Sequence, residues 1–141
     1  MKESMVGFES RVAEALGTKE VPEVSLRYLR CYRTYLLNHL DKNCVLTGRE
    51  DFLWEEIYIF GPGDKAEYAR LKKKRPSYTD EYRLLAIISN KVVDNDLIAR
   101  VKRLSDRKIF EIGLSWLTTK DEKCPEFQFI DDFASWVVNC F

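Results

Sequence analysis

Apolar residues recur at helical spacing over the first 40 residues and predict two helices. The first covers residues 4–16 and is followed by Gly17, a residue type that often ends a helix in the left-handed conformation. The second covers residues 22–40, and Pro22 suits its first turn. The apolar stripe of the second helix consists of Leu29, Tyr32, Leu36 and Leu40.

The middle of the chain predicts two strands and one helix. Cys44–Thr47 is a short strand-like run. Residues 52–60 are rich in aromatic and β-branched side chains and stop at Gly61–Gly63, which predicts a second strand. Asp64 is followed by a glutamate three residues later, and this capping-box spacing predicts a helix start. Pro76 ends that helix.

The second half of the chain changes from helical spacing to strand-like runs. Tyr82–Ser89, Leu97–Leu104 and Ile109–Leu117 are predicted as three strands, with a loose connection over residues 90–96. Residues 105–108 form a polar link of four residues between the last two strands. Links this short cannot hold a parallel crossover, so we expect the three strands to pair antiparallel.

The last segment, Phe127–Phe141, carries the strongest amphipathic helix pattern in the chain. We expect Phe133 and Val137 to lie in the core, and residues 118–126, with Glu126 at their end, to form a charged surface loop. The positions at helical spacing are Ile130, Phe133, Ala134, Val137, Val138 and Phe141. The whole pattern predicts one α+β domain over residues 1–141: two N-terminal helices, an antiparallel sheet of about four strands, a mid-chain helix and a C-terminal helix.

Composition narrows the class of protein. The chain has 141 residues, of which 45% are hydrophobic and 33% charged, the profile of a soluble globular domain. Its 23 basic and 23 acidic residues cancel, which argues against an obligate binder of nucleic acid. No apolar run has the length of a membrane span, and the first residues lack the apolar core of a secretory signal. We therefore expect a cytoplasmic protein.

Four cysteines and one histidine offer little metal or redox chemistry by spacing. Cys31, Cys44, Cys124 and Cys140 match no C-x-x-C pattern, and His39 is too isolated to complete a Cys/His site by spacing. In a reducing compartment such cysteines behave as separate buried thiols. We therefore expect four free thiols.

The candidate metal ligands are four acidic residues, Glu50, Asp51, Glu55 and Glu56. Calcium needs several oxygen ligands converging on one point, and carboxylates on neighbouring loops can supply them. No EF-hand pattern accompanies this acidic cluster. A solvated or ion-paired acidic face explains the same residues, because charged side chains usually lie at the surface.

Two further motifs have a chemical and a structural interpretation. The run Lys72–Arg75 can contact phosphates, but it also suits the C-terminal end of a helix. The turn Gly61–Asp64 lacks the spacing of a Walker or dinucleotide-binding loop, and a structural turn explains it better. No nucleophile elbow, zinc-protease motif or deaminase motif is present. Trp116, Trp136 and the phenylalanines near them are expected in or against the core, and would mark a partner surface if exposed.

Two stretches carry a family resemblance, Leu46–Glu56 and Arg100–Phe110. With the layout of helix, acidic segment and closing hairpin, they resemble small bacterial calcium-binding proteins of the cyanobacterial CcbP type, and small bacterial proteins to which no activity is attached. The resemblance implies calcium binding rather than catalysis. It assigns no ligand residue by residue.

The sequence therefore predicts a non-enzymatic binding or protein-interaction domain. A calcium-binding protein that uses the cluster of Glu50, Asp51, Glu55 and Glu56 is the alternative, and a hydrolase with an unrecognised carboxylate site is the third hypothesis. We expect no required cofactor, with calcium possible, and a protein partner rather than nucleic acid or membrane. The pattern leaves the oligomeric state open.

Overall fold

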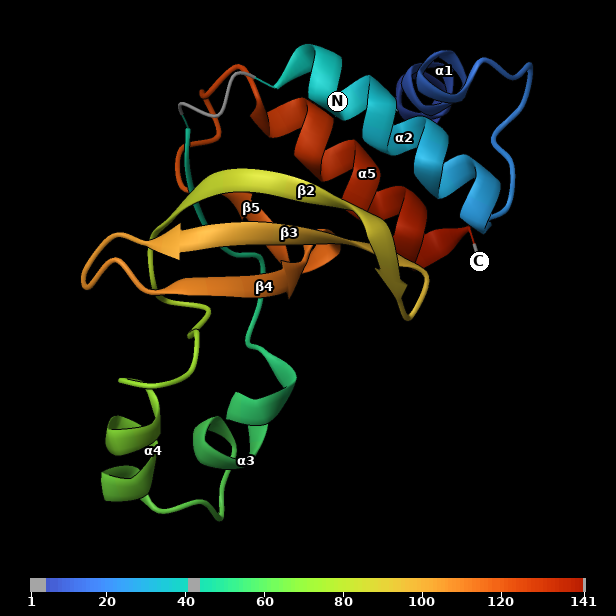
Figure 1. Ribbon diagram of the computed structural model, residues 1–141. Coiled ribbons are helices and arrows are strands. Elements are labelled where there is room, and N and C mark those ends of the chain that lie inside the picture. The colour runs from blue at the N-terminus through green and yellow to red at the C-terminus, as the bar shows by residue number, and fades with distance from the viewer. Residues whose placement is uncertain (1–4, 41–43, 141) are drawn as a thin grey trace.

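Helices cover one face of a five-stranded antiparallel sheet in the computed structural model, which describes residues 5–40 and 44–140 (Figure 1). The helices on this side are α1 (Met5–Leu16), α2 (Leu26–His39) and α5 (Phe127–Asn139). The strands are β1 (Val45–Gly48), β2 (Tyr82–Val93), β3 (Asp96–Arg103), β4 (Ile109–Gly113) and β5 (Leu117–Thr119). Their order in the sheet is β4-β3-β2-β1-β5. The α+β class and the antiparallel pairing are as the sequence predicts.

The N-terminal helices match the apolar pattern, with one shifted boundary. Gly17 follows α1 with a φ of +68°, the left-handed conformation expected of it. The second helix begins at Leu26 and not at Pro22, because Ser25 caps it. The Ser25 hydroxyl accepts the backbone N–H of Tyr28 at 3.3 Å and satisfies one of the first-turn donors.

The connection between β2 and β3 is tighter than the sequence suggests. The strands continue to Val93 and resume at Asp96, so the expected loose link over residues 90–96 is wrong. Asp94 and Asn95 make the two-residue turn with φ values of 54° and 58°, which matches the hairpin turn whose twist fits the flanking strands.

The third expected strand, Ile109–Leu117, is divided. Its first part, β4, pairs with β3 and ends at Gly113. A single 3-10 turn, η2 (Leu114–Trp116), follows. The last part, β5, pairs with β1 at the opposite edge of the sheet. The break occurs where the backbone N–H of Ser115 donates to the Asp96 carboxylate at 3.2 Å instead of to a strand. The chain thereby passes from one edge of the sheet, at β4, to the opposite edge, at β5.

The core lies between the sheet and the helices α2 and α5. Phe133 and Trp136 of α5 are fully buried, and their rings pack against Tyr32 of α2 with centroids 5.1 and 5.2 Å apart. Val137 is also buried, as predicted, whereas Val138 is 57% exposed. The last position of the predicted stripe, at residue 141, lies outside the described residues.

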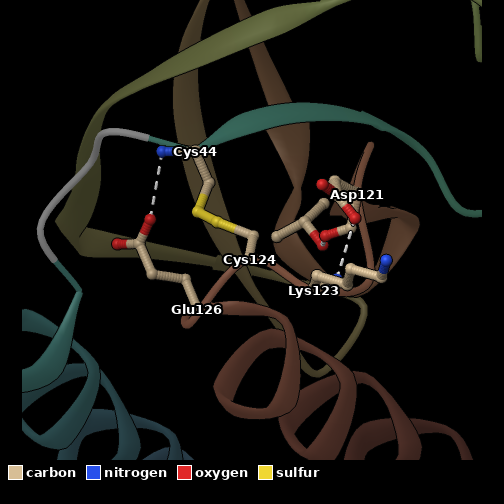
Figure 2. The surroundings of a disulfide bond; sticks show 6 residues. Cys44, Asp121, Lys123, Cys124 and Glu126 are labelled. Carbon is tan, nitrogen blue, oxygen red and sulfur yellow. Dashed lines mark hydrogen bonds between the residues drawn. A yellow bond between two sulfur atoms is a disulfide. The ribbon is translucent and has the colours of Figure 1, made fainter.

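Two of the four cysteines are paired, which corrects the expectation of four free thiols (Figure 2). A disulfide joins Cys44, just before β1, to Cys124, just before α5, with their Cα atoms 6.4 Å apart. Cys31 and Cys140 are free. Because the paired residues are 80 positions apart, the cross-link removes about 4 to 5 kcal/mol of chain entropy from the unfolded state in the loop-closure treatment.

Glu126 is a buried residue and not part of a surface loop. Only 4% of it is exposed, and its carboxylate accepts the backbone N–H of Cys44 at 3.1 Å. Truncation of this side chain should therefore lower stability, because it would leave a buried donor with one partner fewer. Sequence reasoning missed this contact because 82 residues separate the two groups.

Truncation of Phe133 tests the core. We expect Phe133→Ala to lower the free energy of unfolding by about 3 to 5 kcal/mol, because a fully buried ring leaves a cavity. Val138→Ala, on the same helix but exposed, should change it by less than about 0.5 kcal/mol. Urea denaturation measures both. Equal stability of Phe133→Ala and the parent protein would contradict the placement of α5.

The disulfide makes a second prediction. Alkylation of the unfolded, non-reduced protein should label two cysteines, and alkylation after reduction should label four; four labels without reductant would contradict the pairing. The double variant Cys44→Ser/Cys124→Ser should lose about 2 to 5 kcal/mol of stability under non-reducing conditions. Cys31→Ser, at an exposed free thiol, is the matched control and should lose little.

Candidate interaction surface

Residues 49–76 form an arm that projects from the sheet on the side away from α1, α2 and α5 (Figure 1). The arm contains a 3-10 turn, η1 (Leu53–Glu55), and the short helices α3 (Glu56–Ile59) and α4 (Lys65–Leu71). The strand predicted over residues 52–60 is therefore wrong. The helix predicted after Asp64 is confirmed. The Asp64 carboxylate caps it by accepting a hydrogen bond from the backbone N–H of Glu67 at 3.0 Å.

A buried carboxylate explains why residues 52–60 are not a strand. Glu55 is fully buried and accepts hydrogen bonds from the Tyr68 hydroxyl at 2.7 Å, the Ser77 hydroxyl at 2.6 Å and the Tyr78 backbone N–H at 2.9 Å. It also accepts the Phe52 backbone N–H at 3.4 Å, which closes the turn around it. These bonds replace the water that a charged group loses on burial. They fix η1 against α4 and the segment that leads to β2.

Burial also acts on the tyrosine in this cluster. Desolvation, and after it the hydrogen bond to Glu55, raises the pKa of Tyr68 to about 12. The phenol therefore stays protonated at neutral pH and remains a donor to the carboxylate. The Tyr68 ring stacks on Tyr58 with centroids 5.1 Å apart, which ties α3 to α4.

A buried arginine holds the C-terminal end of α4. Arg103, at the end of β3, is 2% exposed. Its guanidinium donates at 2.7 to 3.0 Å to the backbone carbonyls of Lys72, Lys73 and Arg75 and to the carboxylates of Asp80 and Asp106. The carbonyls at a helix C-terminus carry partial negative charge, so a cation is favoured there. The Lys72–Arg75 run thus caps the arm through its backbone, and its phosphate contacts stay a prediction.

The arm exposes several large apolar side chains. Leu53 is 69% exposed, Ile57 52%, Ile59 36% and Phe60 74%, and all four lie within eight residues. The described part of the chain has six other large apolar side chains with comparable exposure, and they are scattered over the rest of the molecule. We call these four residues the apolar arm surface. Exposed apolar groups concentrated in this way mark an interaction site more often than scattered ones do.

Two hollows lie beside Leu53, where the arm meets the sheet; we call this place the corner. One, of about 330 Å³, is lined by Leu53, Trp54 and Trp116 among others. The other, of about 280 Å³, is lined by Leu53, Trp116, Asp96 and Ile98 among others. The mostly aromatic and aliphatic wall of the first hollow is typical of sites that receive an apolar side chain. The second hollow also has Asp94, Asp96 and Ser115 in its wall.

Cations line the sheet face next to the corner. Val101 points into the core, so its neighbours Arg100 and Lys102 point to the opposite, open face. Arg83 pairs with Lys102 across β2 and β3 and shares this face. Glu111 lies opposite Arg100 and accepts its guanidinium at 3.2 Å. Positive charge exceeds negative charge among these residues.

Asp96 is a buried titratable group inside the corner, whose hollows are also lined by Asp94 and Glu111. It is 5% exposed and accepts the Ser115 hydroxyl at 2.6 Å and the Ser115 backbone N–H at 3.2 Å. Desolvation raises the pKa of Asp96 to about 6, although the bonds from Ser115 act in the opposite direction. No sequence motif indicates this group, because its surroundings come from β4 and η2.

The four acidic residues proposed as metal ligands do not converge. Glu50 and Glu56 are exposed and Asp51 is half-buried, whereas Glu55 points into the arm. Within residues 5–40 and 44–140, these four do not form a set of three or more donor atoms close enough to share one ion. Their role as calcium ligands stays a prediction.

A hollow of about 600 Å³ lies elsewhere, between α1 and α5. Its polar groups include an ion pair of 2.6 Å between Arg11 and Asp132, and the Gln128 amide donates to the same carboxylate at 2.9 Å. These bonds tie α1 to α5, which gives the polar groups a structural role.

No protein-family model, curated protein or solved structure matches this chain. In the part of the chain that the structure describes, no helix is long and apolar enough to cross a bilayer. The interpretation of the surface therefore rests on its own chemistry.

The raised pKa of Asp96 predicts a pH dependence. The folded pKa of about 6 exceeds the ordinary aspartate pKa of 3.8, so the folded state binds more protons than the unfolded state between these two values. Asp96 therefore contributes to the free energy of unfolding below about pH 4, and this contribution is lost as the pH rises to about 6. The loss is at most about 3 kcal/mol. We expect the stability of the parent protein relative to Asp96→Asn to fall over this range. Urea midpoints from pH 3.5 to 7 measure it, and a flat difference would contradict it.

Proposed function

We propose that this protein is a non-enzymatic protein-binding module that binds a partner segment with apolar anchors and acidic flanks. The observation that carries the proposal is the apolar arm surface, formed by Leu53, Ile57, Ile59 and Phe60. An arm that exposes this much apolar surface to water has a thermodynamic reason to be covered. Large aromatic and aliphatic anchors at the centre of an interface supply most of its binding energy.

The support beneath the surface favours binding by a preformed site. The Glu55 and Arg103 hydrogen bonds hold both ends of the arm before any partner arrives. A surface that is already ordered loses less conformational entropy on binding. The corner beside Leu53 then offers hollows for one or two apolar side chains.

Charge selects the kind of partner. Arg83, Arg100 and Lys102 lie on the open sheet face beside the corner, with Glu111 as the opposing charge among them. Asp94 and Asp96 line the corner itself. Acidic flanks on a partner would be attracted to this face and would be steered toward the corner. The attraction should weaken with salt, because exposed charges are screened.

The hydrolase hypothesis has less support. Glu55 and Asp96 are the buried carboxylates nearest the corner, and both accept hydrogen bonds from neighbouring hydroxyl and backbone groups. Such bonds explain their burial without a reaction. Their placement favours a structural role.

A peptide display experiment tests the proposal. Random peptides are selected for binding to the parent protein. Their binding is then compared with their binding to the double variant Leu53→Ser/Phe60→Ser. We expect enriched peptides with aromatic or aliphatic anchors and flanking Asp or Glu, and binding at least tenfold weaker to the double variant. Both substituted side chains are exposed, so the melting temperature should change little. Val138→Ser, exposed on α5, is the matched control and should bind as the parent does.

Three outcomes would overturn the proposal. The first is that no selected peptide binds the parent protein more tightly than the double variant. The second is that the selected peptides lack acidic residues and bind with an affinity that is insensitive to salt. Sedimentation of the parent protein alone may instead reveal dimers that the double variant does not form, in which case a second copy occupies the corner.

Calcium binding, as the resemblance to CcbP-type proteins implies, is tested on the same protein. Calorimetric titration with Ca²⁺ is compared between the parent and the triple variant Glu50→Gln/Asp51→Asn/Glu56→Gln. These side chains are exposed or half-buried, so the variant should remain folded. Heat that is present in the parent and absent in the variant would establish the alternative.

A further inference from the structure

We propose that reduction of the disulfide converts Cys44, Cys124 and Glu126 into a binding site for a zinc-class divalent cation. The two sulfur atoms and a carboxylate oxygen of Glu126 all lie within 4.8 Å of one another. This cluster lies at the start of β1 and of α5, away from the corner. It is therefore independent of the proposed partner binding.

The spacing suits a tetrahedral ion. Zinc binds thiolate sulfur at about 2.3 Å and carboxylate oxygen at about 2.0 to 2.2 Å, so two sulfurs on one ion lie about 3.8 Å apart. The Cα atoms of Cys44 and Cys124 are already 6.4 Å apart, which leaves room for the sulfurs to separate by side-chain rotation. The oxygen of Glu126 then needs only a small movement to complete three ligands.

The carboxylate is held in place beside the sulfurs. The backbone N–H of Cys44 donates to Glu126 at 3.1 Å, and Figure 2 shows the Glu126 carboxylate next to that N–H, to one side of the disulfide. Glu126 is 4% exposed, so a negative charge is kept close to the cysteines with little water around it. A hydrogen bond of this kind orients a metal ligand and supports its charge.

Solvent reaches the cluster through an open hollow beside Cys124. Cys124 lies three residues before α5, and its backbone carbonyl accepts the N–H of Phe127 at 3.0 Å. Two lysines and two acidic residues line the same hollow as Cys124, namely Lys120, Lys123, Asp121 and Glu122. Because Cys124 is half-buried and lines an open hollow, an ion can reach it from solvent, and water can take the fourth position.

The redox step balances with an external dithiol. Two electrons and two protons from the dithiol reduce the S–S bond to two thiols, and the dithiol becomes a disulfide. Binding of the cation then releases the two thiol protons to solvent. Two thiolates and one carboxylate favour zinc or cobalt over calcium, which prefers six or more oxygen ligands. An external disulfide that accepts two electrons re-forms the S–S bond by thiol–disulfide exchange and expels the ion, so metal binding follows the redox state.

Cobalt titration tests the site on the full chain. The protein is reduced with dithiothreitol, freed of reductant under argon and titrated with Co²⁺, whose thiolate charge-transfer and visible d–d bands report tetrahedral sulfur ligation. We expect one Co²⁺ per chain, displaced by Zn²⁺ and not by Ca²⁺. The oxidised protein should show no bands. Glu126→Gln should bind at least tenfold more weakly and keep the bands, because both sulfurs remain.

Cysteine variants locate the ligands. Cys31→Ser/Cys140→Ser removes the two free thiols and should bind as the parent does. Cys44→Ser/Cys124→Ser should lose the bands, and circular dichroism checks that this variant is folded. The oxidised parent is a second control, because its sulfurs are unable to bind the ion although no residue is substituted. Absence of bands in the reduced, folded parent would overturn the proposal. So would bands that persist in Cys44→Ser/Cys124→Ser, or affinity unchanged in Glu126→Gln.

Discussion

The buried carboxylate of Glu55 is the interaction on which the arm depends. A charge without water must be matched by donors, and the donors that match it come from three places: η1 itself, α4 and the segment before β2. Removing the carboxylate would leave several of these donors buried without it, at about 1 to 3 kcal/mol each. The same requirement that makes Glu55 costly to bury makes the arm adopt a single arrangement.

The segment between α4 and β2 connects this carboxylate to a second buried charge. Ser77 donates to Glu55, while Asp80 accepts the guanidinium of Arg103 at 2.9 Å. The Tyr82 hydroxyl donates to the Ser77 carbonyl at 2.6 Å and anchors the segment at the start of β2. Both ends of the arm are thus fixed to the sheet through a few residues. This is why short helices, which are marginal alone, can present an exposed apolar surface in a fixed orientation.

The two proposed sites lie at the two ends of β1. Before the strand, Cys44 meets Cys124 and Glu126; after it, the chain enters the arm. Binding in the corner depends on exposed apolar side chains and long-range charge. Metal binding depends on the redox state of two sulfurs. The two proposed activities use different chemistry, so each can be measured in a variant that lacks the other.

Local pattern alone determined much of this protein. The helical stripes of α1, α2 and α5, the cap at Asp64 and the antiparallel strands of the second half follow from residue spacing, because each depends on neighbours within about four residues or on a two-residue alternation. The core position of Phe133 follows from the same stripe. The α+β class needed nothing more.

Tertiary structure decided the rest. Residues 52–60 have strand-like composition, yet Glu55 finds its donors 13 and more residues away, and their hydrogen bonds outweigh β propensity. The contact between Cys44 and Glu126 spans 82 residues, and the disulfide spans 80. Spacing along the chain carries no signal for contacts at such separations. Buried charges and cross-links are set by which segments meet in space, and that is fixed only when the sheet and its helices have assembled.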